Sequence, residues 1–79
     1  MPVELRLFAS AREAAGVDRD TVPGRTVEEV LSEASIRYGA SFRAILPSCR
    51  IWVNGEQVEY SSPVQPGDEV AVLPPVSGG

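Results

Sequence analysis

The chain has 79 residues, enough for one small domain, and carries eleven acidic against seven basic residues, all arginine, for a net charge of −4. This balance argues against a nucleic-acid partner, which requires a basic surface, and favours neutral or basic proteins. Histidine and lysine are absent and Cys49 is the single cysteine, which excludes histidine-based catalysis, Schiff-base chemistry, an internal disulfide and a cysteine-rich metal site.

The sequence predicts a cytoplasmic protein. No apolar run approaches the roughly 20 residues of a membrane span. The N-terminus lacks the apolar segment of a signal peptide, and a lone cysteine fits a reducing compartment.

The first three elements follow from alternation and turn residues. Residues 3–9, VELRLFA, alternate and predict a strand with one buried face. The buried side chains would be Val3, Leu5, Leu7 and Ala9. Residues 10–16 predict a short helical turn that Gly16 ends, and residues 18–24 a second strand that ends at a Pro-Gly turn.

The main helix begins at a capping box, with Thr26 as N-cap and Glu29 three residues later. Apolar residues then recur at helical spacing and predict one buried stripe, before Gly39 ends the helix. The stripe consists of Val27, Val30, Leu31, Ala34 and Tyr38. Ile36 lies about half a turn off it, so the pattern leaves Ile36 unplaced unless the following loop covers it.

The second half predicts a loop, a hairpin and a last strand. Residues 40–48 read as a loop with room for one helical turn, ended by Pro47. Asn54-Gly55 between two alternating runs predicts a hairpin over 50–60 with a type I′ turn. Residues 69–73 predict a strand. Its inward residues would be Val70 and Val72, and its outward residues Glu69, Ala71 and Leu73.

The order strand, strand, helix, hairpin, strand predicts a two-layer α+β domain, with one main helix packed on a mixed sheet. We expect this domain to span residues 1–73, with a flexible tail over 74–79. Cys49 is expected to be an inert thiol in the core or at its edge.

Three segments carry a resemblance to a known family: LFASAREAAG, WVNGE and GDEVAVLPPVSGG. At this spacing they resemble the ubiquitin-like sulfur carriers, in particular the small-subunit branch of molybdopterin synthase. The resemblance covers essentially the whole chain and implies a β-grasp fold. It also implies that a ubiquitin-activating-like adenylyltransferase uses ATP to adenylate Gly79, and that sulfur transfer then gives a thiocarboxylate.

The same resemblance implies that the large synthase subunit takes up the tail, and that sulfur is delivered there to form the dithiolene of molybdopterin. It implies a heterotetramer of small and large subunits, with the catalytic side chains on the partner. This chain would bind no cofactor or metal itself and would not be catalytic alone.

The tail residues suit this role. Pro74 and Pro75 favour an extended path, which lowers the entropy lost on insertion. Val76 provides an apolar contact and Ser77 continues the tail, while Gly78 and Gly79 lack side chains that would block a narrow channel. Fully extended, residues 74–79 reach about 18–20 Å. The alternative is an ordinary frayed end.

A docking surface is predicted beside this tail. Phe8 and Leu73 point outward from the first and last strands, which are neighbours in a β-grasp sheet, so they would form one exposed apolar patch. Arg12 matches a family arginine near the partner-contacting surface. The alternatives are an isolated surface aromatic at Phe8 and a solvated helix charge at Arg12.

Other functions stay open at this stage. They are a thiamine-pathway or other biosynthetic sulfur carrier, a ubiquitin-like protein modifier that forms isopeptide bonds with lysines, and a plain interaction module.

Overall fold

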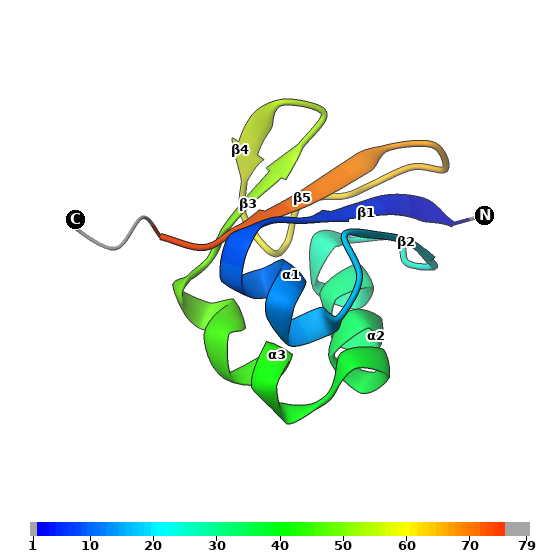
Figure 1. Ribbon diagram of the computed structural model, residues 1–79. Coiled ribbons are helices and arrows are strands. Elements are labelled where there is room, and N and C mark those ends of the chain that lie inside the picture. The colour runs from blue at the N-terminus through cyan, green and yellow to red at the C-terminus, as the bar shows by residue number, and fades with distance from the viewer. Residues whose placement is uncertain (1, 76–79) are drawn as a thin grey trace.

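The computed structural model describes residues 2–75, which form a five-stranded mixed sheet covered on one face by helices (Figure 1). The strands are β1 (Val3–Leu7), β2 (Arg19–Val22), β3 (Arg50–Val53), β4 (Glu56–Val58) and β5 (Glu69–Leu73). The helices are α1 (Ala9–Ala15), α2 (Val27–Tyr38), α3 (Ala40–Ile45) and the 3₁₀ turn η1 (Leu46–Ser48). The predicted α+β class is confirmed.

The first and last strands lie side by side in the middle of the sheet. The strand order is β2-β1-β5-β3-β4, and β1 and β5 are parallel while the other neighbours are antiparallel. The register pairs Leu5 with Val70 and Leu7 with Val72, and all four side chains are buried beneath the helices. These strands form the floor of the core.

The predicted inward position of Ala9 is wrong. β1 ends at Leu7, and Ala9 is an exposed residue at the start of α1. The backbone at Phe8 explains the difference: its N–H donates to the Val72 carbonyl, while its carbonyl accepts from the N–H groups of Ala11 and Arg12 and so starts the helix. Ala11 is the buried residue in this segment, and Gly16 ends α1 as predicted.

The main helix agrees with the sequence pattern except at Ile36. The N-cap hydroxyl of Thr26 accepts from the Glu29 N–H at 3.2 Å, as a capping box predicts. The Glu29 carboxylate accepts from the Arg25 N–H, one residue before the Thr26 N–H that a capping box would use. The predicted stripe is buried, with Tyr38 at its half-buried end. Ile36 is 71% exposed, so the following segment does not cover it.

Residues 40–48 are more regular than the predicted loop. They form α3 and η1 because Phe42 and Leu46 are buried in the core one helical turn apart. The Phe42 ring packs edge-to-face with Tyr38, with centroids 5.2 Å apart. α3 ends at Ile45, with Leu46 as its C-cap directly before Pro47, as predicted. Pro47 lies in the first turn of η1, where its missing N–H is not needed.

The two tight turns have the backbone that their residues predict. Asn54 and Gly55 both have positive φ, 50° and 86°, as the predicted type I′ turn requires. At the corner between β2 and α2, a Cβ on Gly24 would lie 2.6 Å from Val30 Cγ2 and 2.8 Å from the Val30 nitrogen. Only glycine allows the chain to pass this close to the helix.

A polar cluster joins the edge strand β2 to the end of α2. The Tyr38 hydroxyl donates to Asp20 at 2.6 Å, and Arg37 donates to the same carboxylate at 3.2 Å and to the Thr21 carbonyl at 2.8 Å. The pKa of Asp20 is lowered, mainly by the hydrogen bond from Tyr38. Burial, with a contribution from Asp20, raises the pKa of the Tyr38 phenol. Both groups therefore keep their neutral-pH protonation states in the fold.

Removal of this hydroxyl in Tyr38→Phe should lower the free energy of unfolding by about 1 kcal/mol at neutral pH, because one buried hydrogen bond is lost while the ring contact with Phe42 remains. The lowered pKa of Asp20 stabilises the fold above its ordinary value of 3.8, and this contribution disappears as the pH falls through the folded value. The difference between wild type and variant should therefore shrink in acid. Urea unfolding at several pH values measures it.

Tyr60→Phe is the matched control, since the Tyr60 hydroxyl makes only a long bond of 3.4 Å to the Leu46 carbonyl. Its loss of unfolding free energy should be smaller and should not shrink in acid. Equal losses in the two variants would contradict a specific role for the Asp20–Tyr38 bond.

Candidate functional site: the open sheet face and the root of the tail

The predicted tail begins at the end of the central strand. β5 lies between β1 and β3, and Pro74, half-buried, follows its last residue, while Pro75 is exposed. The predicted site residues Val76, Ser77, Gly78 and Gly79 lie outside the described residues. The fold thus directs the chain away from the middle of the sheet rather than from an edge.

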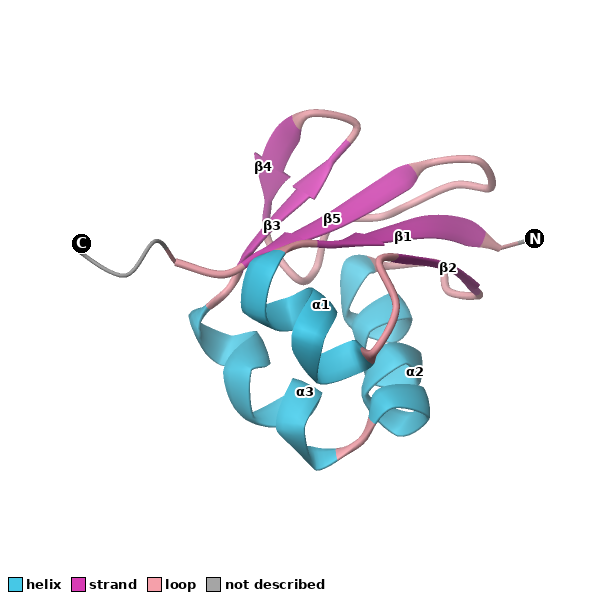
Figure 2. Cartoon of the chain, viewed as in Figure 1, coloured by secondary structure: helices cyan, strands magenta, loops and turns pink. Residues whose placement is uncertain are grey.

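One face of the sheet has no helix over it. All the helices of residues 2–75 lie on the opposite face, as Figure 2 shows. The register brings Arg6, Ala71 and Trp52 side by side across β1, β5 and β3, and places Leu73 beside Arg50. These residues alternate with buried ones, so they belong to the uncovered side. We call this surface the open face.

Phe8 lies at the edge of the open face, next to the tail root. Its side chain is 39% exposed, and its N–H bond to the Val72 carbonyl fixes it beside β5. The Arg6 guanidinium lies over the Phe8 ring, 5.5 Å from its centroid, and Arg6 also pairs with Glu69 at 3.3 Å. The predicted adjacency of the first and last strands is confirmed. Phe8 itself lies one residue beyond β1, and Leu73 is half-buried.

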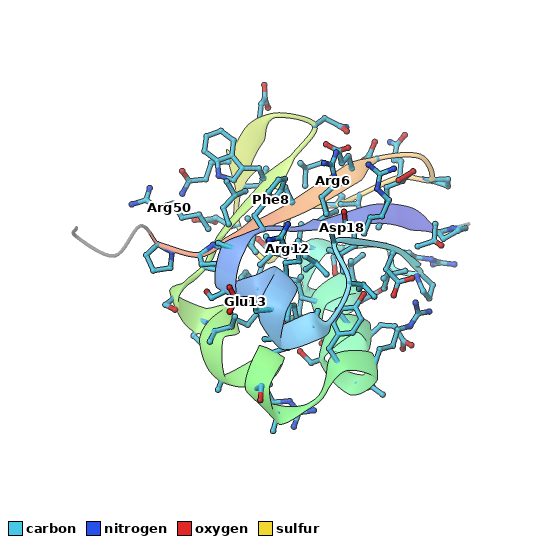
Figure 3. All side chains as sticks on the ribbon, viewed as in Figure 1. Arg6, Phe8, Arg12, Glu13, Asp18 and Arg50 are labelled. Carbon is cyan, nitrogen blue, oxygen red and sulfur yellow. The ribbon has the colours of Figure 1, made fainter. Side chains whose placement is uncertain are left out.

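Arg12 is an exposed residue in the last turn of α1, one helical turn beyond Phe8. Its N–H donates to the Phe8 carbonyl, so the helix start sets both residues at the same corner of the molecule. Figure 3 shows Arg12 close to Phe8 in this view. The structure therefore brings Phe8, Arg12 and the tail root to one end of the domain.

Two residues of this surface were not predicted from sequence. Trp52 is half-buried on the open face, and the exposed Arg50 stands opposite Leu73, beside the point where the chain leaves β5 (Figure 3). The signal was present in the alternation of RIWV, because a buried Ile51 implies that Arg50 and Trp52 point outward. Together with Phe8 and Leu73, Trp52 makes the open face partly aromatic.

Cys49 lies at the edge of the core, as predicted. It is half-buried against the core, and its thiol donates to the Ile45 carbonyl at 3.3 Å. Burial raises the pKa of the thiol, which keeps it protonated and unreactive.

Residues 2–75 lack two features that would indicate other functions. No group of three or more His, Cys, Asp or Glu side chains there has the arrangement of a metal site. Nor does that part of the chain include a helix with the length and hydropathy to cross a bilayer.

Curated relatives resemble the chain over nearly its full length. The molybdopterin synthase sulfur carrier subunit of Chlamydomonas reinhardtii is 32% identical, with all of both chains aligned. The protein of the same name from Arabidopsis thaliana is 34% identical over 98% of this chain and 82% of its own.

Solved structures share the fold. SAMP1 from Haloferax volcanii is 28% identical, with a TM-score of 0.89 over all of both chains. Small archaeal modifier protein 1 (SAMP1) from Methanosarcina acetivorans is 30% identical, with a TM-score of 0.87 over 99% of this chain and 96% of that one. A chain from the complex of subunits 1 and 2 of the Helicobacter pylori molybdopterin-converting factor has a TM-score of 0.73 over all of both chains, at 24% identity. The domain is thus a ubiquitin-like β-grasp.

The model of the ThiS family matches residues 5–79, which include β1 from Leu5 onward, the other four strands and the segment that follows β5. The two curated relatives named above align with at least 98% of this chain at more than 30% identity. The chain therefore belongs to the ThiS family, and its curated relatives are the sulfur carrier subunits of molybdopterin synthase.

Proposed function

We propose that this chain is a sulfur carrier for the biosynthesis of molybdopterin. Its family and its full-length curated relatives, which bear the name molybdopterin synthase sulfur carrier subunit, are the observation that carries this proposal. The geometry supports it, because the segment that would carry the sulfur follows the central strand directly and begins beside an uncovered, partly aromatic face.

The chemistry would take place on the main-chain carboxylate of Gly79. A carboxylate is an anion at neutral pH and a poor electrophile. Adenylation with ATP, by a ubiquitin-activating-like adenylyltransferase, would turn it into a mixed anhydride with AMP and release pyrophosphate. A sulfur donor would then attack the carbonyl carbon and displace AMP, which gives a thiocarboxylate, the transferable form of sulfur.

We propose that the large subunit of molybdopterin synthase binds the open face and takes residues 74–79 into its active site, in a heterotetramer. The name of the curated relatives implies a multi-subunit synthase, and the Helicobacter pylori chain of the same fold was solved in a complex of subunits 1 and 2. Phe8, Leu73 and Trp52 would be the apolar contacts, with Arg12 and Arg50 at their margin.

A second candidate function is covalent protein modification. The observation that favours it is the high similarity to the SAMP1 structures, of which one is described as a modifier protein. In that role the activated carbonyl of Gly79 would be attacked by a lysine amine of a target protein. A carrier for thiamine or another product would use the same thiocarboxylate with a different acceptor.

Protein that is produced together with its adenylyltransferase and a sulfur donor should gain the mass of one sulfur in exchange for one oxygen. Intact-mass spectrometry measures this change, and fragmentation should locate it at Gly79. A variant with one residue added after Gly79 should keep its original mass, because its terminal carboxylate lies beyond the glycine.

The alternatives give different results in the same samples. Target proteins with this chain attached through lysine would favour the modifier. Co-purification with the large synthase subunit, rather than with a thiamine-pathway enzyme, would separate the two sulfur carriers. A terminus that stays unmodified with the cognate activating system would contradict both the carrier and the modifier.

Phe8→Ala should weaken binding to the large subunit by about tenfold, as expected when an aromatic interface contact is removed. The fold should survive, since Phe8 is 39% exposed and its sheet hydrogen bond comes from the backbone. Isothermal titration measures the affinity, and circular dichroism checks the fold.

Ile36→Ala is the matched control, because Ile36 is also an exposed apolar residue but lies on α2, in the helical layer. Its affinity should equal that of the wild type. If Phe8→Ala bound as tightly as Ile36→Ala, the open face would not be the docking surface, while the sulfur mass test would be unaffected.

A further inference from the structure

The side chain of Asn54 fastens the turn between β3 and β4 to the start of β5. Its Nδ2 donates to Asp68 Oδ1 at 3.0 Å, and its Oδ1 accepts from the Glu69 N–H at 3.0 Å. The second Asp68 oxygen accepts from the Gln65 N–H at 2.9 Å. We call these four residues, Asn54, Gln65, Asp68 and Glu69, the Asn54 clasp.

Asn54 is followed by Gly55 in an exposed turn, which is the arrangement most open to deamidation. With no side chain on Gly55, its backbone nitrogen can approach the side-chain carbon Cγ of Asn54. Attack forms the N–Cγ bond of a five-membered succinimide and releases the side-chain amide as ammonia, which carries away the proton of the Gly55 nitrogen. Water then opens the ring to aspartate or isoaspartate, so no oxidant or further reactant is needed.

The clasp opposes this attack. The reaction requires the Asn54 amide to turn so that Cγ faces the Gly55 nitrogen, and that rotation breaks the bonds from Nδ2 to Asp68 and from Glu69 to Oδ1. The reactive conformation is therefore reached only when the turn separates locally from β5.

The product would in turn prevent the clasp from forming. Aspartate at position 54 puts an oxygen where Nδ2 now donates to Asp68, so two carboxylates would meet at hydrogen-bond distance. The Gln65 N–H and the Asn54 amide lower the pKa of Asp68, so Asp68 stays ionised at neutral pH. Isoaspartate would also lengthen the backbone of the turn by one methylene.

We propose that Asn54 is a deamidation site gated by the clasp, and that its modification irreversibly releases the β3–β4 hairpin turn from the start of β5. The reaction needs neither an enzyme nor a partner, so the proposal is independent of the sulfur-carrier function.

The rate is tested by incubation of the purified chain at mildly alkaline pH, followed by peptide mapping of the mass and of isoaspartate at position 54. Asp68→Ala removes the acceptor, and the rate should rise about fivefold, the population change expected for the loss of one hydrogen bond of ordinary net strength. Asp68→Asn retains one acceptor oxygen for two donors, Asn54 Nδ2 and the Gln65 N–H, so its rate should lie between those of the wild type and Asp68→Ala.

Glu56→Ala is the matched control, since it removes an exposed carboxylate at the same turn. Its rate should not change. The proposal is overturned if Asp68→Ala reacts no faster than wild type, or if the folded wild type reacts as fast as the chain in denaturant. Circular dichroism verifies that each variant is folded during the incubation.

The consequence of the modification is tested with Asn54→Asp. Its midpoint of thermal unfolding should fall below that of the wild type. Adding Asp68→Asn to this variant should restore most of the lost stability. The amide at position 68 would then donate to the carboxylate at position 54, which is the reverse of the wild-type bond. An Asn54→Asp chain as stable as wild type, or a double variant no better than the single one, would overturn this part of the proposal.

Discussion

The parallel pairing of β1 with β5 is the constraint on which the rest of the domain depends. Two parallel strands cannot be joined by a tight turn, so a long stretch of chain separates β1 from β5. That stretch forms the helical layer and the flanking strands, with β2 beside β1 and with β3 and β4 on the other side of β5. Because β1 and β5 run in the same direction, Phe8 and Pro74 leave the sheet at the same end. The tail root and the aromatic surface are neighbours for this reason alone.

Charge is unevenly distributed along the open face, which the net value of −4 conceals. Arg50 and Arg12 lie at the end beside the tail root, whereas Glu4 and Glu69 lie at the opposite end of β1 and β5. The prediction of neutral or basic partners rests on total charge. The arginines beside the tail root instead favour acidic groups on a partner that meets this end of the open face, because attraction between charges acts over short distances in salt.

Much of the fold could be predicted because its local signals agree with its packing. The capping residues of α2, the Asn54-Gly55 turn and the alternation in β1 and β5 each specify one conformation. The β1–β5 adjacency came from the family resemblance, since strand order has no local signal. α3 was underestimated because the burial of Phe42 and Leu46 depends on tertiary contacts. Trp52 was missed although its alternation was visible, and the terminal glycines lie outside the described residues.

The central position of β5 has a mechanical consequence. A partner that holds the open face and draws on the segment after Pro74 applies its force along the axis of β5. The hydrogen bonds to β1 and β3 run across that axis, so the load falls on both ladders at once, in shear. An edge strand pulled in the same direction would load only one ladder. The central position of β5 therefore opposes such a pull with two ladders of hydrogen bonds.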